Sequence, residues 1–432
     1  MVRDAVTAPR AEEDVKQKSS GFILIVAATA IVGIAGYVIT WLVPRSIGVG
    51  PYAVFAVFWS FIFLVAAALT GIQQEVTRAT HPRDPANTGY RNRAGVFALA
   101  AFLAVLVLVL GTAPLWQARV FPVDGWSLVL PLAVGAASYV PLAVLAGSLY
   151  GIGHWNALFG LIVVEGVLRL VLVGIALAFL PGPVPLAWAV AIPFPVAVLV
   201  IWPFARARVV GKTQLDVALP ALTWNVVRTI VAAASMGLMV SGFPLVLSLT
   251  SATVPAAELG LVILAATLTR APLIVVGMAL QSFLIVFFRG RLARFWRSLL
   301  QLEALVLGLG AVLAALGYLL GPAVFTFLFP NEGVPEAWVI ATFVASSALV
   351  GALCVSAPAV LSRNAHSAFT AGWVVAALAT VLCLMLPLDF LERTMLALLV
   401  GPAAGVLLHG IYLAVARNSE TAPVTPDALV TD

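Results

Sequence analysis

Three charged residues stand inside long apolar segments, where a charge needs a chemical partner. Glu165 and Arg169 are four residues apart, so a helix would place them on one face, where they can pair. Arg270 lies in the run Leu268-Thr269-Arg270-Ala271-Pro272, with no acidic residue within one helical turn. An ionisable group at the centre of a bilayer is unfavourable by about 2.5–3.5 kcal/mol on insertion scales. These three side chains are therefore the first candidates for ligand binding.

Each candidate has two interpretations. Glu165 and Arg169 form either a closed structural pair or a pair that opens, with Arg169 facing an anionic ligand and Glu165 as its resting partner or a protonatable site. Glu165 is also the acidic residue expected in the middle of a span, so it is the candidate for binding a coupling cation. Arg270 cannot lose its proton, so it needs a partner on another helix, water or an anionic ligand. The planar guanidinium suits phosphate because it can donate two parallel hydrogen bonds.

A second polar group stands at the end of an apolar segment rather than inside one. Gln73, Gln74, Glu75 and Arg78 follow one another closely, and Gln281 occupies the corresponding place later in the chain. These residues form either part of a gate at the cytoplasmic rim or ordinary interfacial anchors and helix caps.

No catalytic motif accompanies these residues. The sequence contains no GxxxxGK[ST] loop, no GxSxG, no HExxH and no CxxC, and its four histidines are dispersed. Cys354 and Cys383 lie in apolar segments and are expected to be buried thiols. We therefore expect no enzyme, no catalytic residue, no metal and no cofactor.

The composition explains where these residues must lie. Of the 432 residues, 62% are apolar and 9% are charged, against about 45–50% and about 25% in an ordinary soluble domain. So few charges cannot cover a water-facing surface of this size. This excludes a soluble globular enzyme, a disordered chain and a nucleic-acid-binding module, and it predicts a membrane lipid bilayer as the surroundings.

Continuous apolar runs, each about 20 residues long, predict membrane-spanning helices rather than the alternating strands of a barrel. The chain is expected to be an all-α polytopic membrane protein with about twelve transmembrane helices. The expected spans are 21–43, 52–75, 94–115, 127–150, 157–180, 186–205, 226–249, 257–285, 299–320, 337–357, 366–387 and 393–415.

The distribution of Lys and Arg predicts the orientation. With the N-terminus inside, 18 of the 23 basic residues lie in inner segments, three lie in outer segments, and Arg169 and Arg270 lie within spans. Basic residues favour the cytoplasmic side, so both termini are expected in the cytoplasm and the protein in the cytoplasmic membrane. The net charge of +5 then mainly reflects topology.

A stretch rich in Arg, Lys and Pro divides the spans into two sets of six, which suggests parallel repeats. The predicted organisation is a cytoplasmic N-terminal tail, an N-lobe, a cytoplasmic linker, a C-lobe and a cytoplasmic C-terminal tail. Their bounds are 1–20, 21–205, 206–225, 226–415 and 416–432.

The turn after the first span, Arg45-Ser46-Ile47-Gly48-Val49-Gly50-Pro51-Tyr52-Ala53-Val54-Phe55, resembles the R-x-L-G-x-x-x-Y-G-x-F signature of polysaccharide exporters and flippases of the MATE/MOP superfamily, the Wzx-like and MurJ-like proteins. Ile47 replaces the usual Leu and Ala53 the usual Gly. The matching positions are Arg45, Gly48, Tyr52 and Phe55. The runs at 73–78 and 269–272 also look like those of actinobacterial members.

The resemblance implies a two-lobe, V-shaped transporter with the MOP flippase fold that moves lipid-linked sugars outward by alternating access. It implies a polyprenyl-diphosphate-linked oligosaccharide as substrate, and glycosyltransferases or a polymerase of the same pathway as partners. Arg270 and Arg169 are then the candidates for holding the diphosphate.

Three other functions stay open at this point. A cation-coupled multidrug-type exporter would share the fold and would use Glu165. A major-facilitator transporter would also have two six-helix halves, but its loop signature matches poorly at Gly89-Tyr90-Arg91-Asn92-Arg93. A non-transporting membrane scaffold of a glycan-synthesis complex is the fourth alternative.

Overall fold

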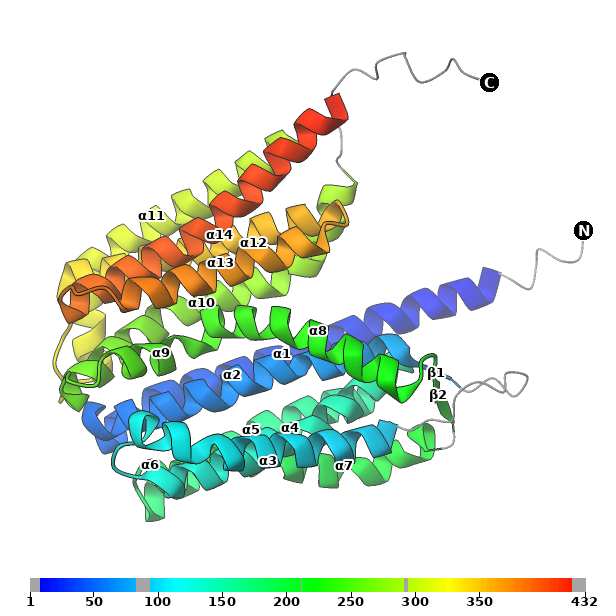
Figure 1. Cartoon of the computed structure of the whole chain (residues 1–432), viewed down its shortest axis with the longest axis horizontal. Helices are drawn as coiled ribbons and strands as arrows, with labels where there is room; N and C mark the ends of the chain where they lie inside the picture. Colours follow the sequence, from blue (N-terminus) through cyan, green and yellow to red (C-terminus); the bar gives the residue numbers. More distant parts are fainter. Residues whose placement is uncertain (1–7, 83–93, 211, 291–293, 422–432) are drawn as a thin grey trace, which may run out of the picture. The chain divides into compact units, whose positions relative to one another are not determined.

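In a computed structural model the chain is almost entirely helical (Figure 1), and the structure describes residues 8–82, 94–210, 212–290 and 294–421. The elements are α1 (Ala8–Ile47), α2 (Val49–Ala79), β1 (Thr80–Pro82), α3 (Ala94–Val120), α4 (Gly125–Gly151), α5 (Trp155–Phe179), α6 (Pro183–Ala191), α7 (Pro193–Val209), β2 (Thr213–Leu215), α8 (Leu219–Gly237), the π-helix η1 (Leu238–Gly242), α9 (Phe243–Thr250), α10 (Ala256–Arg289), α11 (Phe295–Leu328), α12 (Ala337–Ser362), α13 (His366–Leu384) and α14 (Phe390–Thr421).

The expected all-α polytopic fold is confirmed. In the described part of the chain, 11 helical segments are long and apolar enough to cross a membrane, and α10 covers the remaining expected span, 257–285. The first helix begins at Ala8 rather than at residue 21, so much of the expected polar tail continues the first helix.

Proline and glycine shape several of these helices. The sixth span is broken at Ile192, just before Pro193, into α6 and α7. The seventh span consists of α8, η1 and α9, and Pro244 lies in the first turn of α9. Proline lacks the N–H that continues a helical ladder, which accounts for breaks at such positions.

The helices form two compact units, residues 1–264 and 265–432. In the first unit, α2 packs against α4 and α8, α3 against α4, and α1 against α5; in the second, α11 packs against α12 and α13 against α14. The central helices α4 and α12 are mostly buried, whereas α3 and α11 are mostly exposed. Their exposed apolar side chains are those expected to face lipid.

The seventh span, assigned from the sequence to the second half, packs against α2 within the first unit through α8. The division into two six-helix lobes at 206–225 stays a prediction. Within that predicted linker the structure has β2, which pairs antiparallel with β1.

Candidate functional site

The predicted Glu165–Arg169 pair is formed on one face of α5. A guanidinium Nη2 of Arg169 contacts Glu165 Oε1, as the four-residue spacing predicts. The Arg169 side chain is only 5% exposed and that of Glu165 only 14%. The ion pair is therefore shielded within the helices of the first unit, where its strength is not screened by water.

Three aromatic rings surround the Arg169 guanidinium. Its Cζ lies 4.9 Å from the ring centroid of Phe63, 5.2 Å from that of Phe194 and 5.8 Å from that of Trp59. Cations are attracted to aromatic faces within about 6 Å. We call Trp59, Phe63 and Phe194 the aromatic cage; they come from α2 and α7 and bring these helices together around α5.

The arginine retains hydrogen-bonding capacity inside this cage. Among the described residues, Arg169 Nε has no hydrogen-bond partner. Guanidinium carries five N–H donors, and Glu165 engages the Nη2 side. The arrangement can stabilise a buried cation and still offer a donor to an anion.

Arg270 is also buried, at 5% exposure, and belongs to the second unit. It lies in α10, next to Thr269, whose hydroxyl donates to the Ala265 carbonyl at 2.8 Å. Arg169 and Arg270 thus each contribute one buried guanidinium to a different unit. Their joint action on one ligand stays a prediction.

The polar residues at the end of α2 form part of an ion network. Arg78 Nε lies 3.0 Å from Glu75 Oε2, and Arg78 Nη1 lies 3.6 Å from Asp216 Oδ2. The Thr229 hydroxyl donates to Glu75 Oε1 at 3.2 Å. The structure therefore brings Glu75 and Arg78 together, and it adds Asp216 and Thr229, which sequence reasoning did not select.

The other residues of the predicted gate lie apart from this network. Gln74 is exposed, Gln73 accepts the Thr77 hydroxyl through its backbone carbonyl at 2.8 Å, and Gln281 belongs to the second unit. A gating role for any of them stays a prediction.

A short two-stranded antiparallel sheet, formed by β1 and β2, lies beside this network. Thr80 pairs with Leu215, His81 with Gln214 and Pro82 with Thr213. The Asp216 N–H also donates to the Ala79 carbonyl at 3.0 Å. We call β1, β2 and Asp216 the clasp; it ties the segment after α7 to the end of α2.

The segment that resembles the MATE/MOP signature forms the tight turn between α1 and α2. Gly48 has φ 78°, in the left-handed region that glycine adopts readily, and it separates α1 from α2. Arg45 Cζ lies 5.4 Å from the Trp41 ring centroid, while Tyr52 and Phe55 are buried with their ring centroids 6.4 Å apart. These contacts are those of a structural turn.

Sequence reasoning missed an acidic residue in the second unit. Glu303 lies in α11, and both of its carboxylate oxygens are buried with no hydrogen-bond partner among the described residues. The signal was present, because Glu303 is an isolated acid within the apolar run of the expected span 299–320.

Comparison with known proteins relates this arrangement to solved structures. The chain resembles "Lipid II flippase MurJ, inward closed conformation" with a TM-score of 0.67 and 11% identity, covering 91% of this chain and 87% of that one. It resembles the "Inward-facing conformation of a multidrug resistance MATE family transporter of the MOP superfamily" with a TM-score of 0.64 and 15% identity, covering 92% and 96%. At such low identities the structural likeness shows the fold alone: this is an all-helical, multi-pass membrane protein with the fold of MATE/MOP superfamily transporters.

A nearer relative defines the family. The chain is 31% identical over 396 residues to "Uncharacterized protein Mb3654" of Mycobacterium bovis, and the match covers 91% of both chains. The chain therefore belongs to the same family as that mycobacterial protein. No family model matches the sequence.

Proposed function

We propose that this protein is a transporter that flips a lipid-linked oligosaccharide, carried on a polyprenyl diphosphate, across the cytoplasmic membrane by alternating access. The observation that carries the proposal is the buried Arg169 with its aromatic cage and with Glu165 as its ionic partner. A second buried guanidinium, Arg270, supports it. The cell-surface polysaccharide pathway would supply the glycosyltransferases or polymerase that act before and after this step.

The chemistry favours a diphosphate because of the type of charge that is buried. A diphosphate presents several anionic oxygens, and a guanidinium can donate two parallel hydrogen bonds to such a group. An arriving anion would take the place of Glu165 beside Arg169, so binding would exchange one ion pair for another without leaving the cation alone.

The fold supports the same proposal. The solved structures that the chain resembles include that of a lipid II flippase, MurJ. We infer alternating access and a lipid-linked substrate for this chain from that likeness together with the buried arginines.

A direct test uses purified protein in liposomes that contain a fluorescent polyprenyl-diphosphate sugar. Wild-type protein is expected to make the lipid in the inner leaflet accessible to a membrane-impermeant quencher, and Arg169→Gln is expected to slow this at least tenfold. The matched control is Arg119→Gln, because Arg119 is an exposed arginine. Equal rates in empty liposomes and in liposomes with protein would refute the proposal.

The second candidate is a cation-coupled small-molecule exporter of the multidrug type, which Glu165 favours as a buried acid in the first unit. This function predicts that Glu165→Gln abolishes cation-driven efflux of cationic dyes, while lipid flipping is absent. The same liposomes, loaded with dye, distinguish the two functions. A non-transporting scaffold would give neither signal.

A further inference from the structure

The second unit contains a carboxyl group that the proposed transport mechanism does not use. Glu303 lies in α11, more than two helical turns beyond Phe295, where this helix begins. Its neighbours Leu302 and Val306 pack against the apolar cluster formed by α10 to α14, which includes Leu284, Val355 and Leu413. Glu303 is thus held at the margin of a buried apolar core.

A chain of neighbours leads from Glu303 to two other helices. Cys354 of α12 interacts electrostatically with Glu303, and the Gln281 side chain of α10 interacts with the same Cys354 thiol. Gln281 Nε2 also lies 3.4 Å from Met278 Sδ. The three side chains along this path, Cys354, Gln281 and Met278, are all uncharged.

Among the described residues of the second unit, no basic side chain donates a hydrogen bond to Glu303, and Arg363 instead lies over the Phe295 ring at the start of α11, 4.6 Å from its centroid. The sequence of α12 from Ala337 to Ser362 contains no Asp, Glu, His, Lys or Arg. On α10, Arg270 and Arg289 lie about three and two helical turns from Gln281. The basic residue of α11 itself is Arg297, which lies near the start of the helix, six residues before Glu303. Neither carboxylate oxygen has a hydrogen-bond partner among the described residues.

An ionised carboxylate in such surroundings is unfavourable, because it loses water and gains no hydrogen-bond donor among the described residues. The neutral acid avoids this penalty. Glu165 is the contrasting case in this protein, since the same kind of side chain is there paired with Arg169.

We propose that Glu303, with Cys354 near it and Gln281 next to Cys354, is a proton-binding site of the second unit. The site holds a proton on the Glu303 carboxyl in the conformation described. Release breaks the O–H bond and transfers the proton to water, and the carboxylate that remains needs a hydrogen-bond donor. The Gln281 amide, which neighbours Cys354, would supply that donor. Movement of α10 relative to α11 and α12 would therefore accompany gain and loss of the proton.

Applied to transport, the site makes the proton the coupling ion, and this part rests on the proposed function. The protonated site favours the arrangement of α10, α11 and α12 seen here. Deprotonation favours one in which water or an amide reaches Glu303. A proton gradient would therefore favour the protonated arrangement when the site is open to the acidic side of the membrane, and the deprotonated arrangement when it is open to the other side.

Infrared spectroscopy of the full-length protein in liposomes tests the proton site without any substrate. At pH 7, wild-type protein is expected to show the carbonyl band of a protonated carboxyl group, and Glu303→Gln is expected to lose it. Glu303→Asp is expected to retain the band if the protein folds. Glu258→Gln is the matched control and should leave the band in place, because Glu258 lies at an exposed position. A wild-type spectrum without the band, or a band unchanged in Glu303→Gln, would overturn the proposal.

Folding of the test variant is checked in the same samples. Gln has the shape of the neutral acid, so Glu303→Gln is expected to melt at or above the wild-type temperature. A marked fall in its melting temperature would mean that the ionised form stabilises the structure, which contradicts a proton resting on Glu303.

Flipping of the fluorescent polyprenyl-diphosphate sugar under an imposed pH gradient tests the coupling. We expect the gradient to raise the wild-type rate at least threefold and to have no effect on Glu303→Gln, which still flips without a gradient. Glu258→Gln, at an exposed position, should respond like wild type. A gradient-independent wild type overturns the coupling role. Absence of all flipping overturns the proposed function and the coupling with it, while the infrared band still decides the proton site.

Discussion

At the scale of single residues, the first unit is organised around one buried ion pair rather than around many. Arg169 draws α2, α5 and α7 together through its contacts with Glu165 and the aromatic cage. Burying two charges is itself unfavourable, so such a pair is weak evidence for stability alone. We therefore expect the pair to serve ligand binding or a conformational change rather than stability alone.

The energetics of this pair are open to a mutational cycle. Arg169→Gln leaves the Glu165 carboxylate buried without its cation and is expected to destabilise the protein by about 3–5 kcal/mol. The double variant Glu165→Gln/Arg169→Gln removes both charges and should be less destabilised than Arg169→Gln alone. Thermal melting of the purified protein in detergent, with Arg119→Gln as control, measures the differences. Strict additivity of the two single changes would show that the pair does not interact.

The pair could be predicted from the sequence, whereas its surroundings could not. A separation of four residues in a continuous apolar run is enough to place Glu165 and Arg169 on one helical face. The aromatic cage comes from residues more than a hundred positions away from one another along the chain, at Trp59 and Phe194. The hydropathy of the span 299–320 does not indicate a site at Glu303, because one acidic residue changes the average over such a long apolar segment very little.

At the scale of elements, the seventh span carries a built-in irregularity. In a regular α-helix the Leu245 N–H would bond to the Ser241 carbonyl. Here the Ser60 hydroxyl of α2 donates to the Ser241 carbonyl at 2.6 Å and accepts from the Leu245 N–H at 3.1 Å. The π-helix η1 precedes this point. Short π segments of this kind often mark functional positions.

Removing the Ser60 hydroxyl tests whether it stabilises this irregular span. Ser60→Ala takes a hydrogen-bonding partner from two buried backbone groups, and we expect a loss of stability of about 1–3 kcal/mol. Ser60→Thr retains a hydroxyl and should be less affected. Amide hydrogen exchange at Leu245 is expected to accelerate in Ser60→Ala. Unchanged exchange there would mean that the helix satisfies these groups by itself.

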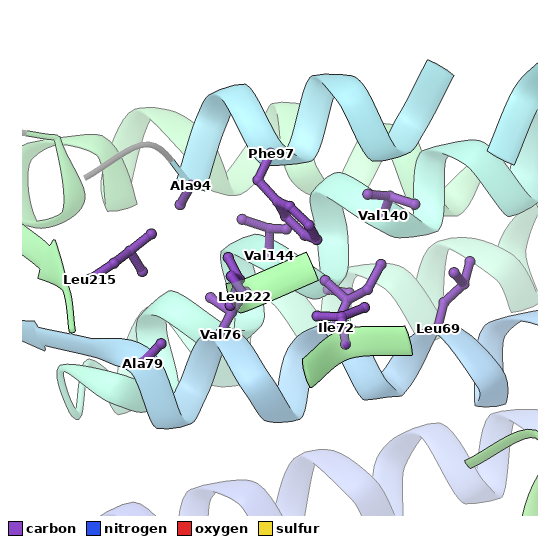
Figure 2. Close-up of a cluster of buried hydrophobic side chains, with 12 residues drawn as sticks. Leu69, Ile72, Val76, Ala79, Ala94, Phe97, Val140, Val144, Leu215 and Leu222 are labelled. Atoms are coloured by element: carbon purple, nitrogen blue, oxygen red, sulfur yellow. The ribbon is translucent and has the colours of Figure 1, made fainter. Parts of the chain in front are cut away.

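In the clasp, burial of an apolar side chain is expected to contribute more stability than an exposed ion pair. Leu215 is 2% exposed and belongs to an apolar cluster with Val76, Ala79 and Leu222 (Figure 2). The neighbouring Asp216 has a side chain that is 38% exposed in its ion pair with Arg78. Exposed ion pairs contribute about 0–1 kcal/mol, whereas truncating a buried Leu removes about 2–5 kcal/mol.

These magnitudes give a paired prediction for the clasp. Leu215→Ala is expected to loosen the pairing of β1 with β2 and to make the segment around residue 213 sensitive to protease. Asp216→Asn should change protease sensitivity little, and high salt should not reproduce the effect of Leu215→Ala. If Asp216→Asn were the more damaging change, the ion network rather than apolar packing would hold the clasp.

This pairing also shows where sequence reasoning ends. Residues 206–225 were recognised as a boundary from their charges and Pro220. A three-residue ladder between Thr80–Pro82 and Thr213–Leu215 has no periodicity to reveal it. Partners more than a hundred residues apart in the chain are set by the packing of α2 against α8, which composition does not encode.

At the scale of the whole molecule, the number of helical spans follows from the sequence because bilayer thickness imposes one length on every apolar run. The helices observed coincide with all the expected spans, including the broken sixth and the irregular seventh. Kinks inside a span leave the hydropathy signal unchanged. The count is therefore more robust than the internal geometry of any one helix.

The basic residues predict the orientation of the protein in the membrane, and labelling of introduced cysteines can test it. Val123, between α3 and α4, is expected outside, and Val210, after α7, is expected inside; both side chains are exposed. The native Cys354 and Cys383 are buried and should react little. Val123→Cys is therefore expected to react with an impermeant maleimide in intact cells, and Val210→Cys only after permeabilisation. The reverse pattern would place both termini outside, against the 18 basic residues assigned to the inner segments.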